Sequence, residues 1–288
     1  MLKPLRCCFV LLLVVAPGVR SQEAQSVPVE FLSGGLHVQG KFFLARDAKP
    51  LYTLLLVPGW PGNPNDVLGL GQLLAERSVN VLMFNPRGLH KSEGTASFSN
   101  TLEDIGAAIR WLGRSETRQR FLVDTARIAL GGHSYGGGLA TAYAALNPSV
   151  RCVISIAGND HGEFIRRYQR DSSLARSIDT MLASTRAPAG PARFDLKATI
   201  RELEENEAIY DLRRNAAKLV DRSILLLGGW EDQQTTIEQI MLPLYRALQS
   251  AGAKDVTFTV YHTNHSFSKV RERMANDIRD WLVRPIPH

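Results

Sequence analysis

The fold is indicated most clearly by residues 128–138, Ile128-Ala129-Leu130-Gly131-Gly132-His133-Ser134-Tyr135-Gly136-Gly137-Gly138. This stretch has the pattern of an apolar strand, a sharp turn and a helix that begins near Tyr135. The spacing Gly132-x-Ser134-x-Gly136 is typical of a turn that presents a nucleophilic serine, and a Cβ at either glycine would clash with a neighbouring strand or helix. We therefore expect the Ser134 hydroxyl at the carboxyl edge of a sheet, beside a helix N-terminus that favours negative charge. A dinucleotide-binding loop does not fit, because G-x-G-x-x-G is not in register.

Outward from this stretch, short apolar runs alternate with amphipathic segments. The expected strands are 54–57, 79–84, 128–130, 153–157, 224–227 and 256–261, and the expected helices lie near 66–77, 101–113, 135–146, 235–250 and 266–283. Strands that are apolar throughout are covered on both faces, and strand-helix alternation gives parallel pairing. Residues 27–33 and 36–45, separated by two glycines, predict an N-terminal antiparallel pair. The sequence thus predicts an α/β, doubly wound, mostly parallel sheet.

Residues 159–222 break this alternation. This segment of 64 residues has 12 Lys or Arg and 11 Asp or Glu. Ile165 with Tyr168, and Leu196 with Ile200 and Leu203, keep helical spacing, and the run 187–191 with two prolines divides the segment into two helical parts. We interpret it as a helical cap insertion over one edge of the sheet; an ordinary crossover with long solvated helices is the alternative. Because the charges nearly balance, the segment does not predict nucleic-acid binding.

The first 21 residues have the pattern of a secretory signal peptide: basic Lys3 and Arg6, an apolar run, and Val19 and Ser21 before a cleavage point. The domain proper is then 22–288, with a secreted or periplasmic location and no stable membrane anchor.

Removal of this segment changes the net charge. The 288 residues carry a formal charge of +6, and 1–21 contains three basic and no acidic residues, so the remainder carries +3. Of three cysteines only Cys152 remains, in an apolar run, where it behaves as a buried hydrophobe.

A serine hydroxyl needs a base to take its proton, and a neutral imidazole is the usual base near pH 7. His262 and His265 both follow the last strand. We favour His265, which falls in the loop, whereas His262 is still in or at the end of the strand. Among the other histidines, His133 is expected to point into packing, and His161 to lie in a loop after a strand.

An acid that orients the base is expected at the carboxyl end of strand 224–227. Glu231 and Asp232 both lie there, and we favour Asp232, because a threonine that follows is free to cap the next helix. A helix-entry carboxylate is the purely structural interpretation of Asp232. Asp160, after the strand that follows the serine, is a further rival for the role of acid.

Two backbone N–H donors are needed to hold the oxyanion of a tetrahedral intermediate. Tyr135 directly follows Ser134 and supplies one. The second is expected from the loop after strand 54–57, where Pro61 has no N–H and Trp60 is the natural donor. Gly59 allows the backbone to approach closely.

Together these residues resemble the α/β-hydrolase superfamily, with the order Ser134, Asp232, His265, and the resemblance covers nearly all of 22–288. The loop Asn85 to Gly94 also looks like the Arg-Gly-x-Gly-x-Ser loop of that family, although His90 and Lys91 depart from it. Within the superfamily the chain is most similar to the dienelactone hydrolase-like and prolyl oligopeptidase-like serine hydrolases. The nucleophilic cysteine of true dienelactone hydrolases is absent, as is the aspartate nucleophile of epoxide hydrolases, and Pro58 replaces the usual histidine before the oxyanion glycine.

The resemblance implies ester hydrolysis through an acyl-enzyme on a small-molecule substrate, with no metal and no cofactor. A peptidase or aminopeptidase is the second possibility, in which a cap glutamate (Glu202, Glu204, Glu205 or Glu207) holds a substrate ammonium. From another class, a binding protein that kept the fold but lost turnover remains an alternative.

Overall fold

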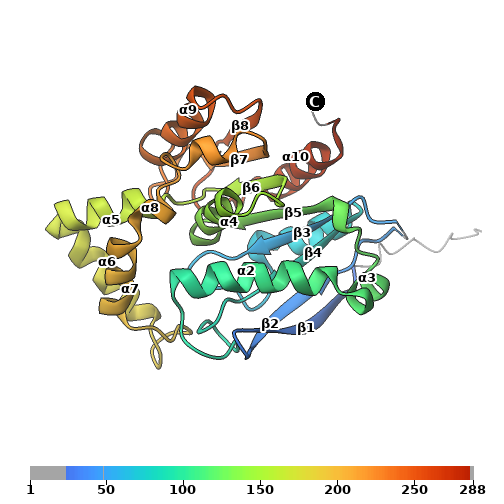
Figure 1. The fold of residues 1–288 in the computed structure, drawn as a ribbon, viewed down its shortest axis with the longest axis horizontal. Coiled ribbons are helices and arrows are strands. Elements are labelled where there is room, and N and C mark those ends of the chain that lie inside the picture. Colours follow the sequence, from blue (N-terminus) through green and yellow to red (C-terminus); the bar gives the residue numbers. More distant parts are fainter. Residues whose placement is uncertain (1–23, 48, 286–288) are drawn as a thin grey trace, which may run out of the picture.

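The sheet of this protein has eight strands. The computed structural model describes residues 24–47 and 49–285, so the predicted signal peptide lies outside the described residues. The strands are β1 (Ser26–Ser33), β2 (Leu36–Phe43), β3 (Tyr52–Val57), β4 (Val79–Phe84), β5 (Ile128–His133), β6 (Cys152–Ile156), β7 (Ser223–Gly229) and β8 (Asp255–Tyr261). Their order across the sheet is β1-β2-β4-β3-β5-β6-β7-β8 (Figure 1).

The strand directions agree with the predicted fold. β1 pairs antiparallel with β2, and β2 pairs antiparallel with β4. All pairs from β4 to β8 are parallel. The side chains of β4 and β6 are buried along their whole length, as expected for strands covered on both faces. The sheet therefore brings the carboxyl ends of β5, β7 and β8 to one edge.

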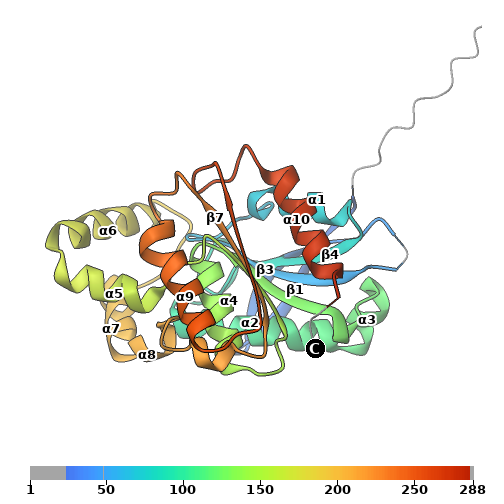
Figure 2. The same ribbon diagram turned by 90° about the horizontal axis from the view of Figure 1, so that it is seen from above.

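Helices cover both faces of the sheet. They are α1 (Leu70–Ala75), α2 (Phe98–Gly113), α3 (Ser115–Phe121), α4 (Tyr135–Leu146), α5 (His161–Arg170), α6 (Ser172–Thr185), α7 (Leu196–Glu205), α8 (Glu207–Tyr210), α9 (Leu242–Ser250) and α10 (Arg271–Val283). Shorter helical turns are Val67–Gly69, Thr125–Arg127, Ala216–Leu219 and Ile237–Met241. Figure 2 shows α1 and α10 on one face of the sheet and α2, α4 and α9 on the other. Each face has its own buried apolar cluster.

Three predicted helices begin later in the structure than expected. The segment expected from residue 235 has a helical turn at Ile237–Met241, and its α-helix, α9, begins at Leu242. The helix expected from residue 66 begins at Leu70, because Leu68 and Gly69 have positive φ angles of 56° and 73°. The Asp66 carboxylate accepts hydrogen bonds from the N–H groups of Gly71 and Gln72, 2.7 and 2.9 Å away, and so fixes this break. The last helix, expected from residue 266, begins at Arg271.

The segment 159–222, which we call the cap segment, lies between β6 and β7 and forms four α-helices, α5 to α8, where two helical parts were predicted. The proline-containing run separates α6 from α7, but Asp171 also ends α5 and begins α6. Its carboxylate accepts from the N–H groups of Ser173 and Leu174, at 2.9 and 3.0 Å. The four helices lie together beyond the carboxyl edge of the sheet (Figure 1). In the described ranges, no helix combines the length and apolar character that crossing a membrane requires.

Candidate active site

Ser134 occupies the turn between β5 and α4. Its φ and ψ are 54° and −117°, a backbone conformation that L-residues rarely adopt. A Cβ on Gly132 would lie 2.3 Å from the carbonyl oxygen of Gly136, and a Cβ on Gly136 would lie 2.4 Å from the carbonyl oxygen of Val57. The N–H of Ser134 donates to the Ile156 carbonyl oxygen at 2.9 Å. The two glycines therefore permit the tight approach that holds Ser134 at the sheet edge.

Asp232 and His265 are brought together from the ends of β7 and β8. His265 Nδ1 lies 2.6 Å from Asp232 Oδ2, and their side chains are 15% and 0% exposed. Asp232 Oδ1 accepts from the N–H groups of Gln234 and Thr235, at 2.8 and 3.0 Å. Burial raises the pKa of Asp232, but the His265 hydrogen bond and these two N–H donors outweigh it and bring the pKa below its usual value. The carboxylate thus stays ionised and accepts a hydrogen bond from Nδ1–H of His265, which selects the tautomer.

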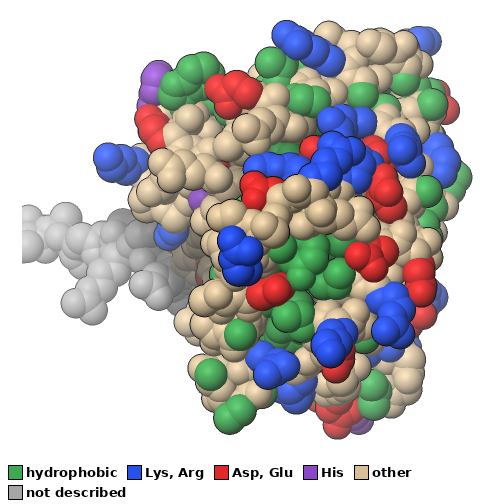
Figure 3. Space-filling view, turned by 90° about the vertical axis from the view of Figure 1, so that its left-hand side faces the viewer, with side chains coloured by type: hydrophobic (Ala, Val, Ile, Leu, Met, Phe, Trp, Pro, Cys, Tyr) green, Lys and Arg blue, Asp and Glu red, His purple; other side chains and the backbone are tan. Residues whose placement is uncertain are grey.

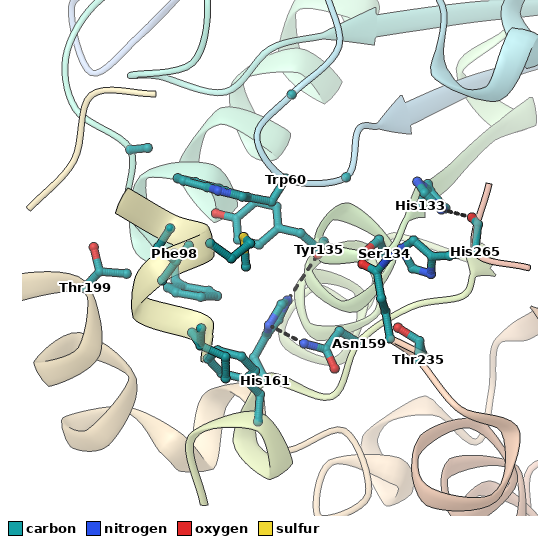
Figure 4. A pocket seen from close by; sticks show the side chains of 18 of the residues that line it. Trp60, Phe98, His133, Ser134, Tyr135, Asn159, His161, Thr199, Thr235 and His265 are labelled. Atoms are coloured by element: carbon teal, nitrogen blue, oxygen red, sulfur yellow. Dashed lines mark hydrogen bonds between the residues drawn. The ribbon is translucent and has the colours of Figure 1, made fainter. Parts of the chain in front are cut away.

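Ser134 and His265 line the same cavity, and Figure 4 shows them as neighbours there. Within the described residues, the Ser134 hydroxyl has no hydrogen-bond partner. In free enzymes, the distance between a nucleophile and its base is often longer than a hydrogen bond and shortens only when substrate binds. With Nδ1 held by Asp232, Nε2 is the nitrogen left to accept a proton.

The alternative acids and base lie elsewhere. Asp160 caps α5, accepting from the Glu163 N–H at 3.0 Å, and its other oxygen lies 3.5 Å from Arg213 Nε. Glu231 and His262 lie 3.7 Å apart with side chains 51% and 91% exposed. Neither carboxylate contacts His265, so the geometry favours the Asp232–His265 pair.

The two expected oxyanion donors also border the cavity. In the part of the chain that the structure describes, neither the Trp60 N–H nor the Tyr135 N–H donates a hydrogen bond. A Cβ on Gly59 would lie 3.2 Å from Ser134 Cβ, so this loop passes directly beside the serine. The Trp60 ring lies edge-on to the Tyr135 ring at 5.7 Å, and its Nε1–H donates to Thr185 Oγ1 of the cap segment at 2.9 Å.

Two histidines at the site were not predicted to be there. His133, expected to point into packing, lines the cavity, and its Nε2 lies 3.0 Å from the backbone oxygen of His265. Burial, and next to it the neighbouring His265, lower the pKa of His133 to about 3. A neutral His133 therefore donates to the loop that carries His265 (Figure 4). Its position directly before Ser134 was the only signal in the sequence.

The second is His161, which was expected in a loop and instead begins α5. Its side chain is buried, with Nε2 3.1 Å from the Tyr135 carbonyl oxygen and Nδ1 3.4 Å from Asn159 Nδ2. Burial lowers its pKa to about 4, so Nε2–H donates to Tyr135 while Nδ1 accepts from Asn159 (Figure 4). The residue connects the cap segment to the start of α4.

The cavity has a volume of about 750 Å³ and extends from Ser134 into the cap segment. Its apolar lining includes Trp60, Phe98, Phe164, Leu174, Ile178, Met181, Leu182, Phe194, Ile200 and Leu203. Among the described residues, no Asp or Glu lines it. On the face of the molecule that carries the cap segment, hydrophobic side chains gather near the middle, with charged side chains around them (Figure 3). This arrangement fits a ligand with an apolar part.

In the described ranges, no group of three or more His, Cys, Asp or Glu is arranged to hold a metal ion.

Arg87 lies in the loop Asn85 to Gly94, which resembles the Arg-Gly-x-Gly-x-Ser loop. It forms an ion pair with the buried carboxylate of Asp104 at 2.6 Å. This loop is thereby fixed to α2.

Comparison with known proteins agrees with this architecture. The family model described as the alpha/beta hydrolase fold matches residues 52–229. An uncharacterized protein of Salmonella typhi, YfhR, is 29% identical over 218 residues, covering 75% of this chain and 66% of that protein. A Salmonella typhimurium YfhR is 33% identical over 139 residues, covering 47% of this chain and 45% of that protein. The chain thus spans less than two thirds of the length of these curated relatives.

Solved structures agree in fold. An esterase of Pyrococcus furiosus superposes with a TM-score of 0.62 at 14% identity, covering 90% of each chain. A Pyrococcus horikoshii acylaminoacyl peptidase gives 0.66 at 18% identity, covering 92% of this chain and 42% of that one. At such identities the likeness shows the fold alone.

Proposed function

Because the chain belongs to the alpha/beta hydrolase fold family, we propose that it is a serine hydrolase that cleaves carboxylic esters through an acyl-enzyme on Ser134. The observation that carries the proposal is the contact of 2.6 Å between His265 Nδ1 and Asp232 Oδ2, beside a serine in the same cavity. Each group comes from the carboxyl end of a different parallel strand, the usual location of ligand sites in such sheets.

The proposed reaction starts with His265 Nε2 taking the Ser134 hydroxyl proton as Oγ attacks the ester carbonyl carbon. The N–H groups of Trp60 and Tyr135 hold the resulting oxyanion. Asp232 stabilises the imidazolium, which then protonates the departing alkoxide. A water activated by His265 attacks the acyl-enzyme and releases the acid.

The cavity supports an ester over an aminopeptidase substrate. A substrate ammonium needs a carboxylate, and in the described part of the chain none borders the cavity. Glu202 accepts from the N–H groups of Phe98 and Ser99 at 3.1 and 2.6 Å, and Glu207 pairs with Arg166. Glu204 accepts from Gln169 at 3.2 Å, and Glu205 is exposed. The glutamates proposed for an ammonium are thus directed elsewhere.

A direct test compares p-nitrophenyl acyl esters with aminoacyl p-nitroanilides. We expect release of p-nitrophenol by the wild-type protein, its loss in Ser134→Ala, and little or no release of p-nitroaniline. Turnover of anilides at rates equal to those of esters would instead favour the peptidase. Ester turnover that survives in Ser134→Ala would contradict the proposed nucleophile.

We further propose that the protein is exported with cleavage after Ser21, on the pattern of 1–21. The mature protein is then expected to begin at Gln22, which N-terminal sequencing of protein isolated from the producing cell measures. An intact N-terminus in that protein would contradict this proposal.

A further inference from the structure

We propose that Arg167 binds a carboxylate at the far end of the substrate's acyl chain, so that the preferred ester has an apolar acyl chain ending in an anion. This inference rests on the proposed function and names its substrate class. The structural basis is that Arg167 lines the cavity and has no side-chain partner among the residues that the structure describes.

Arg167 lies on the face of α5 that borders the cavity. His161, Phe164 and Arg167 follow one another at intervals of three residues, so they share one side of the helix, and all three line the cavity. His161 contacts Tyr135 beside the serine. Arg167 lies six residues farther on, which corresponds to about 9 Å along the helix. A group that contacts Arg167 is therefore at the end of the cavity remote from Ser134.

The adjacent Arg166, unlike Arg167, forms ion pairs with carboxylates of the cap segment. Its guanidinium contacts Asp211 at 2.7 Å and Glu163 at 3.0 Å, and also contacts Glu207. Arg213 binds Glu163 as well. These carboxylates are thus already paired with other arginines.

Arg167, by contrast, has no ion pair and no side-chain hydrogen bond among the described residues. It is half-buried, and Phe164, Leu174 and Ile178 line the cavity with it. A guanidinium with five donors and no acceptor in such surroundings favours an anion, and it binds a carboxylate in a bidentate manner. Arg167 is the one Lys or Arg that lines the cavity within the described ranges, and the lining histidines His133 and His161 are neutral. The net positive charge of this lining favours an anionic ligand over a cationic one.

The kinetic test uses two p-nitrophenyl esters of suberic acid, one with a free terminal carboxylate and one with that carboxylate converted to the primary amide. Length and leaving group are thereby matched. We expect the wild-type protein to prefer the carboxylate ester in kcat/KM by about tenfold or more, as for a charge-assisted hydrogen bond. Arg167→Gln is expected to remove this preference, so that the two esters have nearly equal kcat/KM.

Arg170→Gln is the matched control, because Arg170 lies three residues farther along α5, is exposed and does not line the cavity. It is expected to keep the preference of the wild type. Two results would overturn the inference. One is a kcat/KM ratio of the carboxylate ester to the amide ester that is the same in wild type and Arg167→Gln. The other is a preference that is lost equally in Arg170→Gln.

A binding measurement separates this inference from the proposed function. Calorimetry of suberic acid monoamide with Ser134→Ala, with and without Arg167→Gln, requires no turnover. We expect Arg167→Gln to weaken binding by about tenfold. If the wild-type protein hydrolyses neither ester but this difference persists, ester hydrolysis fails and the anion site stands. Equal affinities overturn the anion site, whatever the esters show.

Discussion

At the residue scale, the proposed role of His265 as a base depends on the ionisation of Asp232. The side chain is buried, yet three hydrogen bonds hold its pKa below the usual value, so at neutral pH it is a carboxylate. A buried carboxylate beside Nδ1 selects the tautomer and, in the proposed reaction, would stabilise the imidazolium formed when Ser134 gives up its proton.

Asp232→Asn removes this charge and nearly preserves the shape. We expect kcat for p-nitrophenyl ester hydrolysis to fall by about three to four orders of magnitude, because an amide favours the wrong tautomer of His265. Circular dichroism is expected to show an unchanged fold. Glu231→Gln, at the exposed neighbouring carboxylate, is the matched control and should change kcat by less than about twofold. Equal losses in the two variants would move the acid away from Asp232.

The strand-helix alternation, with Ser134, Asp232 and His265 each placed just after an apolar strand, was enough to predict that these residues lie at one edge of the sheet. The sequence left Asp160 open as a rival acid, and in the structure Asp160 caps α5 while Asp232 contacts His265. The contacts of His133 and His161 were not predictable in this way. They depend on partners that only the folded sheet and cap segment bring near, such as the backbone oxygen of His265, 132 positions from His133.

At the element scale, the cap segment is attached to the body through the start of α2. Glu202 on α7 accepts hydrogen bonds from two N–H groups in the first turn of α2, where helices leave donors unpaired and favour negative charge. The Tyr210 hydroxyl lies 3.5 Å from the same carboxylate. One side chain thus links α2, α7 and α8.

Glu202→Gln removes the charge and keeps an acceptor. We expect the free energy of unfolding to fall by about 1 kcal/mol in chemical denaturation, since a charge-assisted bond at a helix N-terminus is replaced by a neutral one. Glu205→Gln, exposed on the same helix, is expected to change it by less than about 0.5 kcal/mol. If both variants were equally stable, the carboxylate would contribute nothing to holding the cap segment.

The boundaries of these helices were predicted only in part. Proline-containing residues 187–191 correctly marked the separation of α6 from α7. Asp171 was not recognised as a second boundary, because an aspartate in a charged helical segment has the same pattern whether it faces solvent or caps a helix. Its side chain takes the capping role in the structure, where it contacts two N–H groups.

For the whole molecule, the buried His161 and the partly buried His133 make stability depend on pH. Their pKa values are lowered from 6.5 to about 3 for His133 and about 4 for His161. Such a histidine is neutral when folded and takes up a proton on unfolding below pH 6.5, so its stabilising contribution is fully present above 6.5 and is lost as pH falls toward the folded pKa. Asp232, with its lowered pKa, loses its contribution in the same direction, at still lower pH.

His161→Gln tests this linkage. Between pH 6 and 4.5 we expect the unfolding free energy of the wild type to fall more steeply than that of the variant, by about 1.4 kcal/mol per pH unit for the one proton removed. Denaturation at several pH values measures the two slopes. His262→Gln, at a side chain 91% exposed, is the control and should keep the wild-type slope. If the unfolding free energy had the same pH dependence in wild type and His161→Gln, His161 would not be a neutral residue in the folded protein.

The proposed function depends above all on Ser134 being a nucleophile activated by His265. Incubation of the folded protein with a fluorophosphonate at neutral pH, followed by peptide mass spectrometry, tests it without any knowledge of the substrate. We predict one covalent adduct per chain, on Ser134, and no adduct in Ser134→Ala. A folded wild-type protein that remains unlabelled, or that is labelled on another residue, would contradict it.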